Sequence, residues 1–304
     1  MRAERDVGAP AIAPVEVAKL DARDTRGDRL APGSLAAGRL ALGAVVVLYL
    51  AIVLLGPMGA LVAEVSRIGI GEVLSAVLAP PALEALGMSI ALVAISVVVN
   101  AFVGTIGAIA LVRHRFVGRG LLGALADLPL AVSPVMIGLA FLLLVGREGV
   151  LAPVLEALDW KIVYAFPGLV IGTLFVTLPY TMRELAYVLE EIGTSEEEAA
   201  ATLGASAWQT FWRVTFPNVR VALGYGLLMT AARALGEFGA VLVLGGSISG
   251  QTQTATTFIH DAVEERALAG GYGMALVLGA ISVVLLALLE RLKHRRARAL
   301  GRTK

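Results

Sequence analysis

Apolar residues gather in six long runs between residues 40 and 292, separated by polar stretches. A helix needs about 20 apolar residues to cross a bilayer, because each residue adds ~1.5 Å and the hydrocarbon core is ~30 Å thick. The predicted spans cover residues 40–63, 84–112, 121–145, 163–186, 218–244 and 272–292. The pattern therefore predicts an all-α integral membrane protein with six transmembrane helices.

Prolines lie inside two of these runs. Pro129 and Pro134 fall in the third run. In the fourth run, Pro167 lies near the start and Pro179 lies in the second half. Proline removes a backbone donor, a loss that a membrane helix tolerates when neighbouring groups satisfy the freed carbonyl. We expect the third and fourth helices to be kinked.

The composition agrees with a membrane protein and excludes several other classes. Of 304 residues, 58% are hydrophobic and only 16% are charged, outside the range of soluble domains. The net charge of +1 offers no excess of basic residues to displace counterions from nucleic-acid phosphates. The chain has no cysteine, which excludes a disulfide scaffold, cysteine-ligated zinc and a thiol nucleophile.

Charge outside the runs predicts the orientation. Residues 1–39 mix basic and acidic side chains without an apolar run, so we expect a disordered cytoplasmic tail and not a signal peptide. Residues 293–304 form a basic tail, and residues 113–119 carry three arginines. Because cytoplasmic loops are enriched in lysine and arginine, both termini are predicted to be cytoplasmic, with the transmembrane domain at residues 40–292.

The cytoplasmic connection between the fourth and fifth spans, residues 187–217, is longer than an ordinary loop. Ser195 followed by Glu198 has the spacing of a capping box and predicts the start of a short helix. Gly204 can adopt a positive φ, so we expect it to end that helix and reverse the chain.

A second short helix is predicted over residues 207–215. It places Trp208, Phe211 and Trp212 on one face, and Pro217 would set the start of the fifth span. From chemistry alone, two interpretations stay open: the aromatic face lies in the membrane interface, or it fills a groove on a partner protein.

The spacing in this connection resembles the EAA loop of ABC-importer permeases. Glu198-Ala199-Ala200 is followed after three residues by Gly204, and after nine more by Val214-Thr215-Phe216-Pro217. The family consensus reads EAA, Gly and Ile-x-Leu-Pro at the same intervals, so this chain departs only by Val for Ile and Phe for Leu. The resemblance implies a coupling segment, residues 195–217, that inserts into a cleft on a separate ATPase subunit.

The candidate coupling residues follow from this resemblance and from the aromatic face. They are Glu198, Ala199, Ala200, Gly204, Trp208, Phe211, Trp212 and Pro217.

Two later stretches, residues 232–240 and residues 250–254, resemble the fifth helix and following loop of oxyanion importers. Over residues 84–290 the chain is most similar to the W-type permease family of sulfate/thiosulfate importers. That resemblance implies a permease subunit in the bacterial inner membrane. Its partners would be a T-type permease subunit, two copies of an ATPase that carry ATP and Mg, and an extracytoplasmic sulfate-binding protein. A homodimer and a molybdate or tungstate importer stay open as alternatives.

Arg233 and Glu237 are ionisable residues inside a predicted span, where charge is costly and often functional. They are four residues apart, so they could neutralise each other on one helix face. The alternative is that Arg233 attracts an anion along the translocation pathway.

Other motifs are absent from the sequence. It contains no GxxxxGK[ST] loop, so we expect no ATP or other cofactor on this chain, and no GxSxG or HExxH motif of an enzyme. Its three histidines lack metal-ligand spacing. A secondary anion transporter, the rival class, would usually show inverted repeats and several mid-membrane carboxylates, whereas only Glu237 fits that description.

Overall fold

The computed structural model describes the backbone of residues 32–300 and the side chains of residues 40–293. Within this part of the chain every regular element is helical. Most of the predicted N-terminal tail, residues 1–31, lies outside the described residues. The chain divides into two compact units, residues 1–60 and residues 61–304.

The helices follow one another with short connections. The first seven are α1 (Pro32–Ile68), α2 (Ile70–Val77), α3 (Pro80–Arg113), α4 (Arg119–Ala131), α5 (Pro134–Val145), α6 (Ala152–Ala157) and α7 (Phe166–Ile192). The others are α8 (Ser195–Thr202), α9 (Ala207–Thr210), the π-helical turn η2 (Phe211–Thr215), α10 (Phe216–Leu235), α11 (Gly239–Gly245), α12 (Ala255–Glu264) and α13 (Leu268–Leu300).

The first and last helices extend beyond the predicted boundaries. α1 begins at Pro32 instead of residue 40, and α13 continues past residue 292 to Leu300. Residues 40–55 of α1 expose apolar side chains on every face. Such a helix has no polar side for water, which is typical of contact with lipid.

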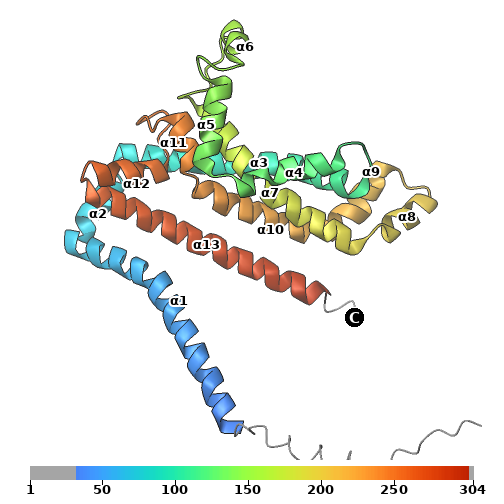
Figure 1. Ribbon diagram of the computed structural model, residues 1–304, viewed down its shortest axis with the longest axis horizontal. Coiled ribbons are helices and arrows are strands. Elements are labelled where there is room, and N and C mark those ends of the chain that lie inside the picture. The colour runs from blue at the N-terminus through green and yellow to red at the C-terminus, as the bar shows by residue number, and fades with distance from the viewer. Residues whose placement is uncertain (1–31, 301–304) are drawn as a thin grey trace, which may run out of the picture. The chain divides into compact units, whose positions relative to one another are not determined.

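The second unit is built around α3, α7 and α10, which lie side by side (Figure 1). Small residues allow this close packing: a Cβ placed on Gly226 of α10 would lie 3.0 Å from the Cα of Thr181 on α7. The same threonine forms a buried hydrogen bond with Thr230 of α10, with 2.9 Å between the hydroxyl oxygens. Asn100 of α3 donates to the hydroxyl of Thr177 at 2.9 Å. The centre of the bundle is therefore joined by polar bonds between helices.

Three described helical segments are long and apolar enough to cross a membrane: Leu40–Ile68, Pro80–Arg113 and Leu268–Lys293. Two bent pairs raise this number to five if each pair counts as one span. They are α4 with α5, bent by 117°, and the helical run Ala207–Leu235 with α11, bent by 55°. α7 occupies the fourth predicted range, but its second half carries charged residues that lower its hydropathy.

The prolines affect the two central runs differently. The third run is broken at Val132 and Ser133, which both adopt extended backbone angles. Pro134 explains the break, because the proline ring disfavours the α conformation in the residue before it. The fourth run shows no such interruption: Pro167 sits in the first turn of α7, and the helix continues through Pro179 to Ile192.

Candidate functional site

The coupling segment begins where α7 ends. Gly193 has a φ of 67°, and α8 starts two residues later at Ser195. The predicted capping box between Ser195 and Glu198 is not formed, because Ser195 is already inside the helix and Thr194 is the N-cap residue. The hydroxyl of Thr194 donates to Oε1 of Glu198 at 2.6 Å instead.

Gly204 reverses the chain as the sequence predicts. Its φ is +83°, a region that favours glycine. The N–H of Gly204 donates to the carbonyl of Ala201, and the N–H of Ala205 donates to the carbonyl of Ala200. These two bonds are the Schellman pattern, which satisfies the last carbonyls of a helix. No other atom lies within 4 Å of a Cβ built on Gly204, so the turn faces open space.

The second helix begins with a capping box that was not predicted. Ser206 accepts from the backbone N–H of Gln209, whose side-chain oxygen accepts from the N–H of Ser206. The signal was present as Ser-x-x-Gln, three residues apart.

The fifth-span helix begins at the predicted proline, because α10 starts at Phe216 and Pro217 lies in its first turn. The chain does not leave the helical conformation before it, however: the helical run is continuous from Ala207 to Leu235 and passes through the π-helical turn η2. In this turn the N–H of Phe216 donates to the carbonyl of Phe211, one residue further back than in an α-helix. The proline, which has no N–H to donate, therefore sits in the first turn of α10, directly after a wider turn.

The aromatic side chains form one connected group. The rings of Trp208 and Trp212 lie 5.5 Å apart, and those of Phe211 and Trp212 lie 5.1 Å apart. Phe216 extends the group, with its ring 5.1 Å from that of Trp212. Trp208 is 70% exposed and Trp212 is 46% exposed. Leu203, at the turn, is 89% exposed, so this end of the segment presents apolar surface.

A polar cluster behind the aromatic group was not predicted. Arg113, the last residue of α3, forms an ion pair with Glu197 of α8, with 2.8 Å between Nε and Oε2. Glu197 also accepts from the hydroxyl of Thr215 at 2.8 Å. Next to it, Glu196 accepts from the side-chain amide of Asn218 at 2.6 Å. The sequence contained no local signal for these contacts, because the ion pair joins residues 84 positions apart.

Arg233 and Glu237 are also paired. Their side chains are 2.7 Å apart between Nη1 and Oε2, and the Glu237 side chain is only 1% exposed, against 25% for Arg233. They do not share one continuous helix, however, because α10 ends at Leu235. Oε1 of Glu237 accepts from the N–H of Ala240 in the first turn of α11, where a carboxylate is favoured by the free N–H groups. The carboxylate therefore has a structural part at the junction of the two helices.

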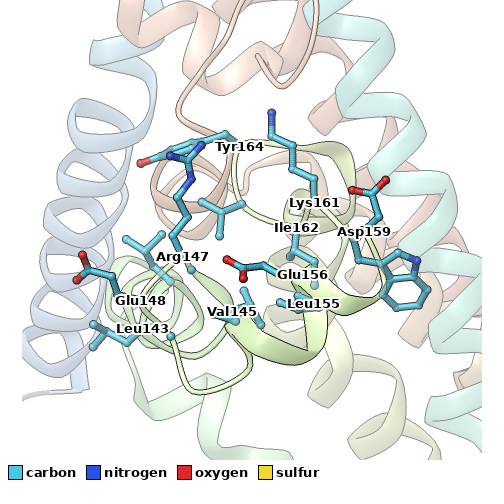
Figure 2. A pocket seen from close by; sticks show the side chains of 16 residues that line it. Leu143, Val145, Arg147, Glu148, Leu155, Glu156, Asp159, Lys161, Ile162 and Tyr164 are labelled. Atoms are coloured by element: carbon cyan, nitrogen blue, oxygen red, sulfur yellow. The ribbon is translucent and has the colours of Figure 1, made fainter.

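A cavity of about 950 Å³ lies outside the coupling segment. It is lined by residues between 142 and 164, from the end of α5 through the connection to α7 (Figure 2). Its charged lining is of mixed sign, with Arg147 and Lys161 beside Glu148, Glu156 and Asp159. Among the described residues no cluster of three or more potential ligands could hold a metal ion.

Comparison with known proteins decides the family. Residues 102–298 match the model of the binding-protein-dependent transport system inner membrane component. The chain belongs to this family. Members are subunits that transport across the membrane, so this is a transport component of the inner membrane and not an enzyme.

Several relatives of this inner membrane component carry more detailed names. The sulfate transport system permease protein CysW of Synechococcus elongatus is 47% identical over 71% of this chain and 75% of its own. CysW of Escherichia coli is 40% identical over 81% of this chain and 84% of its own. The sulfate transport system permease protein CysT of Escherichia coli is 32% identical, over 82% and 90%.

A solved structure shares the fold of this family member. A chain in the crystal structure of a bacterial alginate ABC transporter, in complex with an alginate pentasaccharide-bound periplasmic protein, superposes with a TM-score of 0.70. It covers 90% of this chain and 98% of its own at 18% identity. At this identity the likeness establishes the fold alone.

Proposed function

We propose that this protein is a W-type permease subunit of an ABC importer that moves sulfate or thiosulfate across the bacterial inner membrane. The identity of 40–47% to permeases named CysW over most of the chain supports this substrate class. The observation that carries the mechanism is the exposed helix–glycine turn–helix segment at residues 195–217, which has the spacing of an ATPase-coupling loop.

The proposed topology has six spans and two cytoplasmic termini. Three single helices and two bent pairs supply five of the spans. α7 would be the sixth, because its first half is apolar and it packs against both α3 and α10 in the bundle. The charged second half of α7 would then extend from the membrane into the cytoplasm and carry the coupling segment.

The coupling segment would bind the ATPase through its exposed apolar end. Trp208, Trp212 and Leu203 stay 70%, 46% and 89% exposed, and exposed tryptophans of this kind are typical anchors of protein interfaces. Glu198, the first residue of the EAA motif, is exposed in the same segment and accepts a hydrogen bond from Thr194. It is therefore positioned to meet a basic residue of the partner.

The complete importer would contain this chain, a T-type permease subunit, two copies of the ATPase and an extracytoplasmic sulfate-binding protein. ATP and Mg would bind to the ATPase, and this chain would hold no cofactor. Closure of the ATPase pair on ATP would move the coupling segment and shift the two permease subunits between inward- and outward-facing states. ATP can drive that shift only if the ATPase pair makes different contacts with the permease subunits in the two states.

For Arg233 we propose a second task beside its ion pair. Its side chain is 25% exposed whereas that of Glu237 is almost fully buried, so the cation is the accessible half of the pair. An accessible guanidinium at membrane depth could attract an oxyanion on its path.

The test is uptake of radiolabelled sulfate by cells that lack this gene and are complemented with the wild type. We expect uptake to return and to be reduced by excess unlabelled thiosulfate but not by molybdate. Competition by molybdate alone would point to the molybdate class and contradict the sulfate assignment. Uptake that needs an ion gradient and no ATPase would contradict the importer class.

A matched pair of variants tests the coupling segment in the same cells. Gly204→Asp and Gly118→Asp both place a carboxylate at a glycine with positive φ and no atom within 4 Å of the new Cβ. Only Gly204 lies in the coupling segment, so we expect Gly204→Asp to abolish uptake and Gly118→Asp to retain it. Equal uptake by the two variants would contradict the coupling role of the turn.

A further inference from the structure

α8 lacks the apolar contacts that usually fix a helix in place. None of its residues, Ser195 to Thr202, is buried. Within the coupling segment α8 contacts α9 and η2, and α8 and α9 lie together at one end of the bundle (Figure 1). Burial of apolar area is the main force that orients helices, so here another interaction must hold α8 to the bundle.

Arg113 supplies that interaction at the end of α3. Its Nε lies 2.8 Å from Oε2 of Glu197, and its Nη2 donates to Oε1 of the same carboxylate at 3.4 Å. Both side chains are mostly shielded from solvent, with 11% of the arginine and 20% of the glutamate exposed. The Nε contact is an ion pair without hydrogen-bond geometry and the Nη2 bond is long. The attraction therefore holds Glu197 near the end of α3 mainly through charge, which solvent screens little where both side chains are shielded.

The same guanidinium also binds the end of α7. Nη1 donates to the carbonyl of Leu189 at 3.0 Å, and Nη2 donates to the carbonyl of Gly193 at 2.7 Å. The last carbonyls of a helix have no partner inside the helix, and the negative end of the helix dipole favours a cation there. Arg113 therefore joins three elements, α3, α7 and α8, through one planar group.

The carboxylate of Glu197 extends the chain of contacts to a fourth element. It accepts from the hydroxyl of Thr215, which is buried in η2 at the base of the aromatic group. The neighbouring Glu198 points elsewhere, toward Thr194 and the solvent. Consecutive residues differ by about 100° around a helix, so one glutamate faces the bundle and the next faces outward.

We propose that Arg113, Glu197 and Thr215 form a latch that makes the coupling segment move as one body with the ends of α3 and α7. Arg113 and Glu197 are positioning residues that act through the segment and do not touch the ATPase. The latch deepens the proposed function and rests on it. Without the latch, movement of the ATPase would tilt α8 on its own instead of moving the membrane helices.

The first readout is the number of ATP molecules hydrolysed per sulfate transported, measured on the complete importer in proteoliposomes. For Arg113→Gln we expect this ratio to rise about tenfold, within the usual range of coupling between sites, while the ATPase still assembles and hydrolyses ATP. Arg113→Lys keeps the charge near the helix end but loses the planar fork, so an intermediate ratio is expected.

The second readout is the distance between α3 and the last turn of α8. The chain has no native cysteine, so spin labels can be attached to single cysteines at two positions. One is Ile106 of α3, which is 67% exposed, and the other is Thr202, an exposed residue of α8 outside the proposed ATPase contacts. In the wild type we expect a narrow distance distribution that is the same with and without ATP. In Arg113→Gln we expect a broad distribution that changes with nucleotide.

A matched ion pair provides the control. Arg183 of α7 and Asp127 of α4 form an ion pair of comparable length, with contacts of 2.6 Å and 2.9 Å, and both residues lie outside the coupling segment. Asp127→Asn removes that pair, and we expect both readouts to stay as in the wild type. An equal effect of Asp127→Asn would mean that any lost ion pair loosens the bundle, and would overturn the latch.

The outcomes separate the latch from the proposed function. Wild-type importer that moves no sulfate contradicts the proposed substrate, while the spin-label distances still test the latch on the assembled complex. An unchanged ratio and an unchanged narrow distribution in Arg113→Gln overturn the latch. If that variant fails to assemble, Thr215→Val removes only the hydroxyl contact to Glu197, and an unchanged distance distribution in Thr215→Val then overturns the latch.

Discussion

Replacing Trp208 by alanine should weaken binding of the ATPase far more than it weakens the fold. A tryptophan side chain presents up to about 250 Å² of surface. Because Trp208 is 70% exposed, ~175 Å² of it is open to a partner, worth ~4 kcal/mol at about 25 cal/mol per Å² if all of it were buried. Ordering the side chain and incomplete burial reduce this, so we expect about 2 kcal/mol, or roughly 30-fold weaker binding.

The cost to the fold should be smaller. In the free protein the indole contacts Phe211 and Trp212, with ring centres 6.3 Å and 5.5 Å away. Aromatic pairs of this kind contribute about 0.5–1.5 kcal/mol each at most. We therefore expect the free energy of unfolding to fall by about 1 kcal/mol while the dissociation constant rises by more than a factor of ten.

The assay is titration of the permease, reconstituted in nanodiscs, with fluorescently labelled ATPase subunit. Trp160→Ala is the matched control, because Trp160 is 66% exposed and lies in the connection between α6 and α7, which the predicted topology places on the extracytoplasmic side of the membrane. The control should bind the ATPase like the wild type. Wild-type affinity in Trp208→Ala, or an equal loss in the control, would refute the reasoning that this aromatic group fills the ATPase cleft.

Three further substitutions test other parts of the argument. Arg233→Gln should raise the KM for sulfate several-fold with normal assembly if the cation attracts the anion, and unchanged uptake kinetics would leave it a purely structural partner. Thr181→Val leaves the hydroxyl of Thr230 without its partner, so resistance to unfolding in detergent should fall by ~1 kcal/mol, whereas no change would show that the bond contributes nothing net. Ser206→Ala removes the capping box and should lower the local stability of α9 by about 1 kcal/mol, which would appear as faster hydrogen exchange at residues 207–210. Unchanged exchange there would contradict a stabilising cap.

Features that depend on short stretches of chain were predictable from the sequence. Apolar runs placed helices in all six predicted ranges, because the hydrophobic pattern alone sets where a chain can be helical and lipid-facing. The positive φ of Gly204 and the shared face of the aromatic residues followed from glycine's missing Cβ and from the helical period. These features involve neighbours within a few residues, whose geometry the local sequence dictates.

Features that depend on how helices meet were decided by the tertiary structure. The sequence offers three adjacent glutamates at residues 196–198, and only packing against the end of α3 selects Glu197 as the one that faces inward. The cap at Thr194 and the continuous helix through Pro217 likewise depend on where neighbouring elements lead the chain. Pro134 causes the break before it locally, but the 117° angle across that break depends on packing. The physical reason is that an ion pair between distant residues leaves no periodic trace in the sequence: its partners are matched by position in space, after the local helices have formed and packed.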